Sequence, residues 1–415
     1  MTRRMRRWAV CALVCATAVT GACASKESAP SRPDRPPSTI EAPFEGATAL
    51  PPPDLTDDGP GSLLEVTPLE DMQEFDKIEA TGVRVTYRST DAKGAPTTVS
   101  GVVVVPPGKP PRGGWPIVSL GHDATGVRTD CAPSLAAGLG SYSAIIAAVV
   151  GRGYLVAMTD YQGLGVEGFL HPMLDSVTLG NNMIDAVRAA RHVLPSASNR
   201  WAAFGVGQGG LAAWGANEQA ARYGAGLELV GAIALSPLAD LTGLADAAEN
   251  GTLTPAQYRL QMLVVSTLVT SPDSKANPDD YFSDNAKDTF GYLTNCAVVN
   301  PLENLAAATR LVPGDLKPKT PAAAKQLHDF LQGFALPTPS ALSAPLLVVY
   351  ATSDVFLPPE WIDRAVQAAC GRGEQVQVVR RIGDLSVLND IALYDAVAWL
   401  QGRFAGQRVI DICVA

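Results

Sequence analysis

The sequence predicts an α/β fold, in which a mostly parallel central sheet carries helices on both faces and an inserted helical cap. Strand-length apolar runs alternate with helical segments along the chain, and this alternation is typical of a mostly parallel sheet. Residues 116–120 and 154–159 have the composition of strands that are buried on both faces. The alternation stops between residues 235 and 345, and the Ala- and Leu-rich stretch there predicts a helical cap over about residues 237–340.

The first 60 residues of the 415-residue chain are predicted to lie outside the folded domain. Residues 1–22 predict a signal peptide of the lipoprotein type, because four arginines precede an apolar run that is too short to span a bilayer. Small residues then precede Cys23, which would carry the lipid and hold the chain at a membrane; the alternative is an ordinary secretory signal. Residues 23–60 are rich in Pro and Ser and predict a disordered tether. Both readings place the domain, residues 61–415, outside the cytoplasm.

Charge and cysteine content narrow the classes of partner and site. The net charge of −9 disfavours a nucleic-acid partner, whose phosphates require a basic face. Four cysteines follow Cys23, and an even number in an exported chain predicts two disulfides, with all three connectivities open. No cluster has the spacing of zinc ligands, so no metal is predicted. These four residues are Cys131, Cys296, Cys370 and Cys413.

The predicted elements follow from apolar runs, turn residues and helical spacing, taken in chain order. Residues 93–96, with Gly and Pro, predict a turn between the first two strands. Ile184, Val187 and Leu194 stand at helical spacing, which predicts a helix over residues 181–194. The other strands are predicted at 83–87, 99–105, 116–120, 154–159, 201–204, 229–234, 345–350 and 376–380, and the other helices at 141–150, 211–221 and 388–404.

A glycine-rich turn at residues 204–210 follows one of these strands and precedes a helix of small residues. By its letters it fits the dinucleotide-binding pattern G-x-G-x-x-G, but at least four strands precede it. The next strand also ends in Leu235 and Ser236 rather than in the acidic residue that such a site needs, so no cofactor is predicted. The turn fits the G-x-S-x-G elbow of α/β-hydrolases except at Gly207, which stands where the nucleophilic serine belongs.

Several ordered blocks resemble the secretory lipase family of fungi and actinobacteria, and the resemblance covers roughly residues 62–413. It implies an α/β-hydrolase fold with a helical cap and activity on acylglycerols and other esters, hence a role in lipid catabolism. It also implies that Cys131 pairs with Cys296 and Cys370 with Cys413. The blocks are YRSTD at 87–91, GHDATG at 121–126, CAPS at 131–134, DYQGLG at 160–165 with His171 and Pro172, DAVRAA at 185–190, and QGG at 208–210.

Carried over position by position, the resemblance implies an incomplete catalytic triad. Gly207 takes the nucleophile position, and Asp354 keeps the acid. By its spacing to Trp399, Leu385 takes the position of the base, with Ser386 as the other option. The loss of the base does not depend on alignment, because all four histidines precede Asp354, whereas the triad order in this fold is serine, acid, histidine. The oxyanion donors would be the backbone N–H groups of Gln208 and Asp123.

We therefore expect a degenerate, surface-anchored hydrolase that is inactive or strongly impaired and that binds an acyl or ester ligand. One alternative is an active extracellular lipase or carboxylesterase with a displaced nucleophile, for which Ser236, Ser119 and Ser386 are the candidates, with His122 as a base. The structural interpretation of His122 and His171, as residues bonded within their loops, is favoured over a catalytic one. A second alternative is a non-enzymatic cell-surface scaffold with an unknown protein partner.

Overall fold

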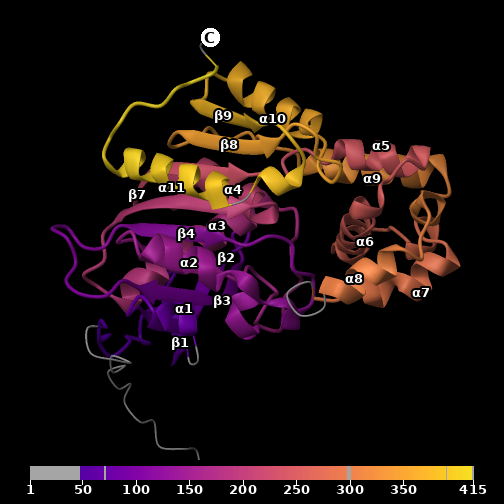
Figure 1. Ribbon diagram of the computed structural model, residues 1–415. Helices are drawn as coiled ribbons and strands as arrows, with labels where there is room; N and C mark the ends of the chain where they lie inside the picture. Colours follow the sequence, from indigo (N-terminus) through magenta and orange to yellow (C-terminus); the bar gives the residue numbers. More distant parts are fainter. Residues whose placement is uncertain (1–46, 70–71, 297–300, 389, 414–415) are drawn as a thin grey trace, which may run out of the picture. The chain divides into compact units, whose positions relative to one another are not determined.

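The computed structural model describes residues 47–69, 72–296, 301–388 and 390–413 (Figure 1). The predicted signal peptide, Cys23 and most of the predicted tether lie outside the described residues. Within the described parts of the chain, no helix is both long enough and apolar enough to cross a membrane.

In the described residues, nine strands form one sheet in the order β1-β2-β3-β5-β4-β6-β7-β8-β9. The first three strands pair antiparallel, as do β3 and β5, and all remaining neighbours are parallel. This sheet confirms the predicted fold class. The strands are β1 (Leu63–Pro68), β2 (Thr81–Thr90), β3 (Pro96–Val105), β4 (Ile117–Gly121), β5 (Leu155–Thr159), β6 (Arg200–Val206), β7 (Glu228–Leu235), β8 (Leu346–Ala351) and β9 (Val376–Arg381).

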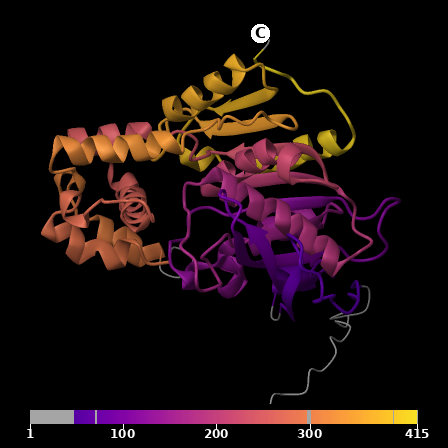
Figure 2. The ribbon, with the colours of Figure 1, turned by 180° about the vertical axis from the view of Figure 1, so that it is seen from behind.

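Helices cover both faces of the sheet (Figures 1 and 2). Because side chains alternate along a strand, Val103 packs into the core on one face, whereas Val102 and Val104 pack into the core on the other. The face of Val103 is covered by α3 (Ser176–Val193), α4 (Gln208–Tyr223) and α10 (Pro359–Gly371). The opposite face is covered by α1 (Gln73–Asp76), α2 (Ser143–Val150) and α11 (Asp390–Phe404).

The segment between β7 and β8 forms the helical cap at one end of the sheet (Figures 1 and 2). Both disulfides are present in the pairing that the resemblance implies. The bridge Cys131–Cys296 ties the cap to the segment after β4, and Cys370–Cys413 ties α10 to the C-terminal segment. The cap helices are α5 (Thr242–Asn250), α6 (Pro255–Thr270), α7 (Asp284–Leu293), α8 (Pro301–Ala308) and α9 (Pro321–Gly333).

Some elements differ from the sequence prediction. The helix predicted from residue 181 begins at Ser176, because the side chain of Asp175 accepts hydrogen bonds from the N–H groups of Val177 and Thr178 and caps an earlier turn. Strand β1 was not predicted, since it pairs on one side only and alternates just weakly in polarity. Helix α10 was not predicted either.

Candidate functional site: a glycine elbow filled by an aspartate

The turn between β6 and α4 has the strand–turn–helix geometry of a nucleophile elbow. Gly207 lies at its apex with φ 56° and ψ −114°, a backbone conformation that L-residues rarely adopt. The strand and the helix approach so closely here that a Cβ on Gly205 would lie 2.0 Å from the carbonyl oxygen of Gly209. The close approach therefore requires glycine at positions 205 and 209, and the backbone that would present a nucleophile is intact.

The carboxyl group of Asp123 occupies the place of the side chain that Gly207 lacks. A Cβ built on Gly207 would lie 2.0 Å from Oδ1 of Asp123. The same oxygen accepts hydrogen bonds from the backbone N–H of Gln208, at 3.1 Å, and from that of Ala124, at 2.7 Å. The N–H of Gln208, one of the two predicted oxyanion donors, thus points at a carboxylate of the chain itself.

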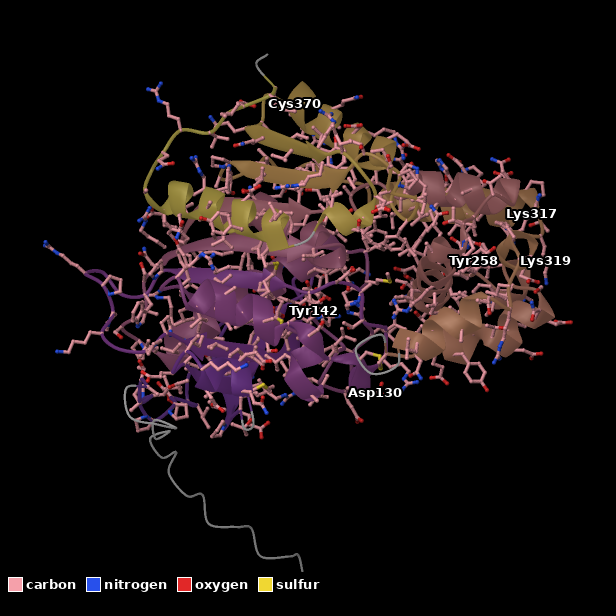
Figure 3. All side chains as sticks on the ribbon, viewed as in Figure 1. Asp130, Tyr142, Tyr258, Lys317, Lys319 and Cys370 are labelled. Atoms are coloured by element: carbon pink, nitrogen blue, oxygen red, sulfur yellow. A yellow bond between two sulfur atoms is a disulfide. The ribbon has the colours of Figure 1, made fainter. Side chains whose placement is uncertain are left out.

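The second predicted donor, the backbone N–H of Asp123, is also engaged, because it donates to the hydroxyl of Tyr142 at 2.8 Å. Tyr142, which is labelled in Figure 3, lies just before α2. This bond therefore ties the loop after β4 to the start of α2. Neither the bond from Asp123 to Tyr142 nor the bond from Gln208 to the carboxylate of Asp123 was predicted from the sequence.

His122 is completely buried in the same loop, and both of its ring nitrogens face carbonyl oxygens. Nδ1 lies 2.7 Å from the carbonyl oxygen of Asp123, and Nε2 lies 3.2 Å from that of Asp160. Burial lowers the pKa of the imidazole, against the opposing effect of these bonds. The contacts agree with a structural histidine bonded within its turn.

The cap holds this loop through Arg259 on α6. Its guanidinium donates to the carbonyl oxygens of Ala124 and Thr125, each at 3.0 Å. Sequence reasoning missed this residue, although a signal exists: Arg259 is the only charged residue in α6. Such an arginine in an apolar helix is expected to find carbonyl or carboxylate partners in the fold.

The side chain of Gln208 anchors the start of α4. Its amide nitrogen lies 2.8 Å from Nε2 of His171 and donates to the carbonyl oxygen of Met173 at 2.8 Å. Burial lowers the pKa of His171 to about 4, so the ring is neutral, donating from Nδ1 to the carbonyl oxygen of Gln162 and accepting at Nε2. This histidine therefore has a structural role in the loop, as expected.

Asp354, at the acid position, follows β8 and is buried. Its Oδ1 accepts the backbone N–H groups of Phe356 and Leu357 at 2.8 and 3.2 Å, and its Oδ2 lies 3.5 Å from the hydroxyl of Ser236. These bonds satisfy the carboxylate locally.

Leu385, at the base position, starts a short 3-10 turn after β9, and 45% of its surface is exposed. Its loop adjoins that of the acid, since the N–H of Ser353 donates to the carbonyl oxygen of Gly383 at 2.8 Å. Ser386 donates to Asp384 at the surface. The fold brings the acid and base positions together, but neither Leu385 nor Ser386 can accept a proton as histidine would.

The other candidate hydroxyls are engaged elsewhere. Ser119, inside β4, donates to the carbonyl oxygen of Met183 at 2.8 Å. Ser236 has a positive φ of 42° and lies beside Asp354 rather than beside a histidine. His192 pairs with Asp57 at the surface, 3.4 Å away.

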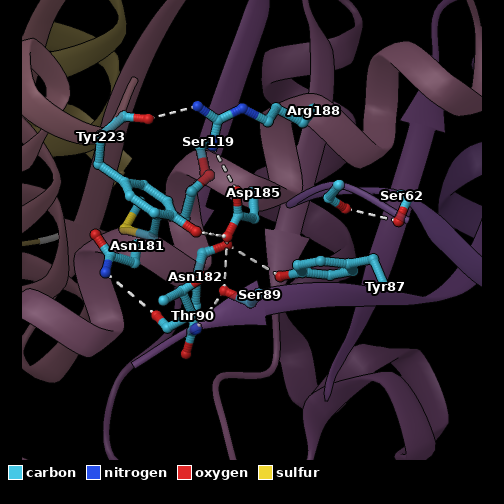
Figure 4. A network of polar contacts seen from close by, with 12 residues as sticks. Ser62, Tyr87, Ser89, Thr90, Ser119, Asn181, Asn182, Asp185, Arg188 and Tyr223 are labelled. Carbon is cyan, nitrogen blue, oxygen red and sulfur yellow. Dashed lines mark hydrogen bonds and ion pairs between the residues drawn. The ribbon is translucent and has the colours of Figure 1, made fainter. Parts of the chain in front are cut away.

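A buried polar network lies where α3 meets β2 and the C-terminal end of α4 (Figure 4). Asp185 accepts hydrogen bonds from Arg188 at 2.6 Å, Ser89 at 2.8 Å and Tyr223 at 2.7 Å. Burial raises the pKa of Asp185 to about 6. The sequence blocks at 87–91 and 185–190 thus meet in the fold, where they join secondary-structure elements.

Comparisons with known proteins agree with this architecture. Residues 135–411 match the family described as secretory lipase. A relative from Mycobacterium tuberculosis (strain CDC 1551 / Oshkosh), described as a probable inactive lipase MT1628, is 27% identical over an alignment 353 residues long. The match covers 80% of this chain and 75% of that protein.

Two solved structures show the same fold at low identity. Candida antarctica lipase A in its closed state is 18% identical, with a TM-score of 0.68 and 85% and 84% of the two chains covered. A rice cell wall degrading esterase, LipA from Xanthomonas oryzae, is 21% identical, with a TM-score of 0.63 and 85% and 100% covered. The two disulfides and the match to a family of secretory proteins indicate an extracytoplasmic protein. This protein belongs to the secretory lipase family.

Proposed function

We propose that this member of the family does not hydrolyse esters. The observation that carries the proposal is the elbow, where Gly207 supplies no nucleophile and the carboxylate of Asp123 takes its space. The acid, Asp354, binds backbone N–H groups and Ser236 instead of a histidine. Without a nucleophile and a base, neither attack on a carbonyl nor proton transfer to the leaving group can follow the ordinary course.

Residual catalysis through the oxyanion hole is expected to be small. In hydrolases that lose triad residues, the hole and substrate binding together leave roughly 10³- to 10⁴-fold catalysis over water. Here the N–H of Gln208 already donates to Asp123, and the N–H of Asp123 donates to Tyr142. Both donors would have to be released before they could stabilise an oxyanion.

An acyl chain or ester is the ligand that we propose for the region beside the elbow. Leu238 borders this region, and its N–H donates to the carbonyl oxygen of Gly207 at 3.2 Å. The cavity there measures only about 10 Å³, enough for at most one water, so α9 would have to move to admit a chain. Its lining is apolar: Leu174, Leu238, Ala239, Leu241, Leu331 and Phe334.

The small cavity also favours a second candidate function, that of a non-enzymatic cell-surface scaffold. In such a protein, side chains would fill the space that the substrate occupies in an active lipase. In both cases we propose that Cys23 carries a lipid and that the residues between Cys23 and Thr48 tether the domain to a membrane. From Thr48 the chain packs on the domain, with Leu50 in its core, so the predicted tether ends earlier than residue 60. Mass spectrometry of the mature N-terminus would test the anchor, since a diacylated Cys23 and a free secreted N-terminus differ in mass.

Hydrolysis is tested with a series of p-nitrophenyl esters from short to long acyl chains and with a serine-reactive phosphonate. We expect no turnover above that of buffer and no labelled residue. The matched variant is Ser236→Ala, which removes the hydroxyl nearest to Asp354. Turnover by the wild type that is lost in Ser236→Ala would refute the proposal and identify a displaced nucleophile.

Ligand binding separates the acyl-binding protein from the scaffold. A fluorescent long-chain fatty acid should bind the wild-type chain, and Leu331→Arg, on the α9 side of the cavity, should weaken binding at least about tenfold by placing a charge in the apolar lining. Equal affinities for both chains, or no binding by either, would favour the scaffold.

A further inference from the structure

We propose that Asp123 acts as a built-in plug of the oxyanion hole, so that the site rejects ester carbonyl groups even before the missing nucleophile matters. The inference rests on the proposed function, because it explains what fills the site of a member that does not hydrolyse esters. It goes further in assigning to one side chain the exclusion of substrate. The plug is defined as the carboxyl group of Asp123 with its two backbone donors, the N–H groups of Gln208 and Ala124.

The first argument is chemical. The N–H of Gln208, the predicted oxyanion donor at the elbow, donates to Oδ1 of Asp123 at 3.1 Å. The same oxygen accepts the N–H of the next residue, Ala124, at 2.7 Å, which holds the carboxyl group in this position. Hydrogen bonds to a charged acceptor are roughly twice as strong as those to a neutral carbonyl. The carboxylate therefore outcompetes an ester carbonyl for the N–H of Gln208.

The second argument is steric. An added Cβ at Gly207 would approach Oδ1 to 2.0 Å and Cγ to 2.5 Å, so the carboxyl group lies inside the volume of a nucleophile side chain. A serine at this position and the carboxylate in its present rotamer exclude each other. The glycine and the plug are thus two parts of one arrangement.

The third argument is that the loop is held in place independently of the carboxylate. Tyr142 binds the backbone N–H of Asp123, and Arg259 binds the carbonyl oxygens of Ala124 and Thr125. The disulfide Cys131–Cys296 joins the following segment to the cap. Shortening the Asp123 side chain should therefore leave the N–H groups of Gln208 and Ala124 in position but unoccupied.

The experiment tests whether a small carboxylate can replace the plug. Thermal unfolding of the full chain without its signal peptide is recorded at pH 7 in 100 mM sodium acetate and in sodium chloride of equal ionic strength. We expect acetate to raise the Tm of Asp123→Ala by about 2 °C, since ligand bound only to the folded state stabilises it. The wild type and Asp123→Asn, whose amide oxygen can accept the same two hydrogen bonds, should show no difference between the salts.

Asp123→Ser serves as a second truncation, and acetate should stabilise it as well. If both truncated chains unfold at the same temperature in the two salts, the proposal is overturned. It is also overturned if neither chain folds, because the carboxylate would then be a structural residue of the loop. Ester turnover by the wild type would instead refute the proposed function, so the two failures can be told apart.

Discussion

The two sides of the candidate site are held in different ways. On the oxyanion side, Gly207 and Asp123 lie among buried residues, and Tyr142 and Arg259 fix the adjoining loop from two parts of the molecule. On the acid–base side, the loop after β9 lies at the surface: 92% of Ile382 and 45% of Leu385 is exposed. It is linked to the acid's loop by the bond from the N–H of Ser353 to the carbonyl oxygen of Gly383 and by the bond from the N–H of Gly383 to the hydroxyl of Thr352.

On the proposed function, this difference accounts for a hydrolase fold that keeps its form without its chemistry. The elbow depends on contacts between backbone atoms, such as those between Gly205 and Gly209, which need no serine. The predicted base position lies on one turn at the surface, where Leu385 is 45% exposed. Substitution on the first side must therefore preserve geometry, whereas the second side can change freely.

The largest expected effect comes from rebuilding the triad with and without the plug. Gly207→Ser with Leu385→His restores both missing groups, but the serine must displace the carboxylate of Asp123. Adding Asp123→Ala removes that conflict and frees the N–H of Gln208. We expect the triple variant to exceed the double variant by about 100-fold in kcat/KM for p-nitrophenyl esters, which is the cost of losing one oxyanion donor.

The control is Leu385→His with Asp123→Ala and no serine, which should stay silent. Equal activities of the double and triple variants would show that the two sides do not differ as described. The carboxylate of Asp123 would then have no effect on catalysis, and only the missing triad residues would account for the lack of activity.

A loss of about 3 kcal/mol in the free energy of unfolding is expected for Arg259→Ala. The substitution leaves two partly buried carbonyl oxygens, of Ala124 and Thr125, without their charged donor. The control is Arg310→Ala in the same cap, where an exposed guanidinium lies 5.1 Å from the ring of Tyr292 and contributes about 0.5 to 1 kcal/mol. Urea denaturation measures both. Similar losses would mean that the cap does not hold the oxyanion side.

The fold class could be predicted from the spacing of apolar residues, because this spacing shows which face of each strand or helix is buried. The position of Gly207 in an elbow followed from local glycine spacing. The contact between Asp123 and Gly207 could not be predicted in this way, because it joins loops after β4 and β6 that meet only through sheet order. The role of Arg259 likewise depends on the packing of the cap against a loop more than a hundred residues earlier. Which residues fill a site is a property of tertiary packing.

The pH dependence of stability tests the polar network around Asp185, at the end of α4 that is remote from the elbow. Burial raises the pKa of Asp185 to about 6, so the folded chain binds this proton more tightly than the unfolded chain does. Stability from this group is therefore present at low pH and is lost as pH rises from about 4 through 6, by about 3 kcal/mol in total. Asp185→Asn should show a correspondingly flatter dependence in urea denaturation between pH 4 and pH 7. If the slope of stability against pH is the same in Asp185→Asn as in the wild type, Asp185 does not bind this proton more tightly in the folded chain.

The smallest effect is expected on the acid–base side. Leu385→Ser should change the free energy of unfolding by less than about 0.5 kcal/mol, because the side chain is half exposed and in a surface turn. Leu238→Ala, beside the elbow and only 3% exposed, should cost about 2 to 5 kcal/mol by leaving a cavity. If Leu385→Ser lowers the free energy of unfolding nearly as much as Leu238→Ala does, the side chain of Leu385 packs as part of the core. The base position would then be locked by packing, and its histidine could be restored only together with the neighbours that enclose it.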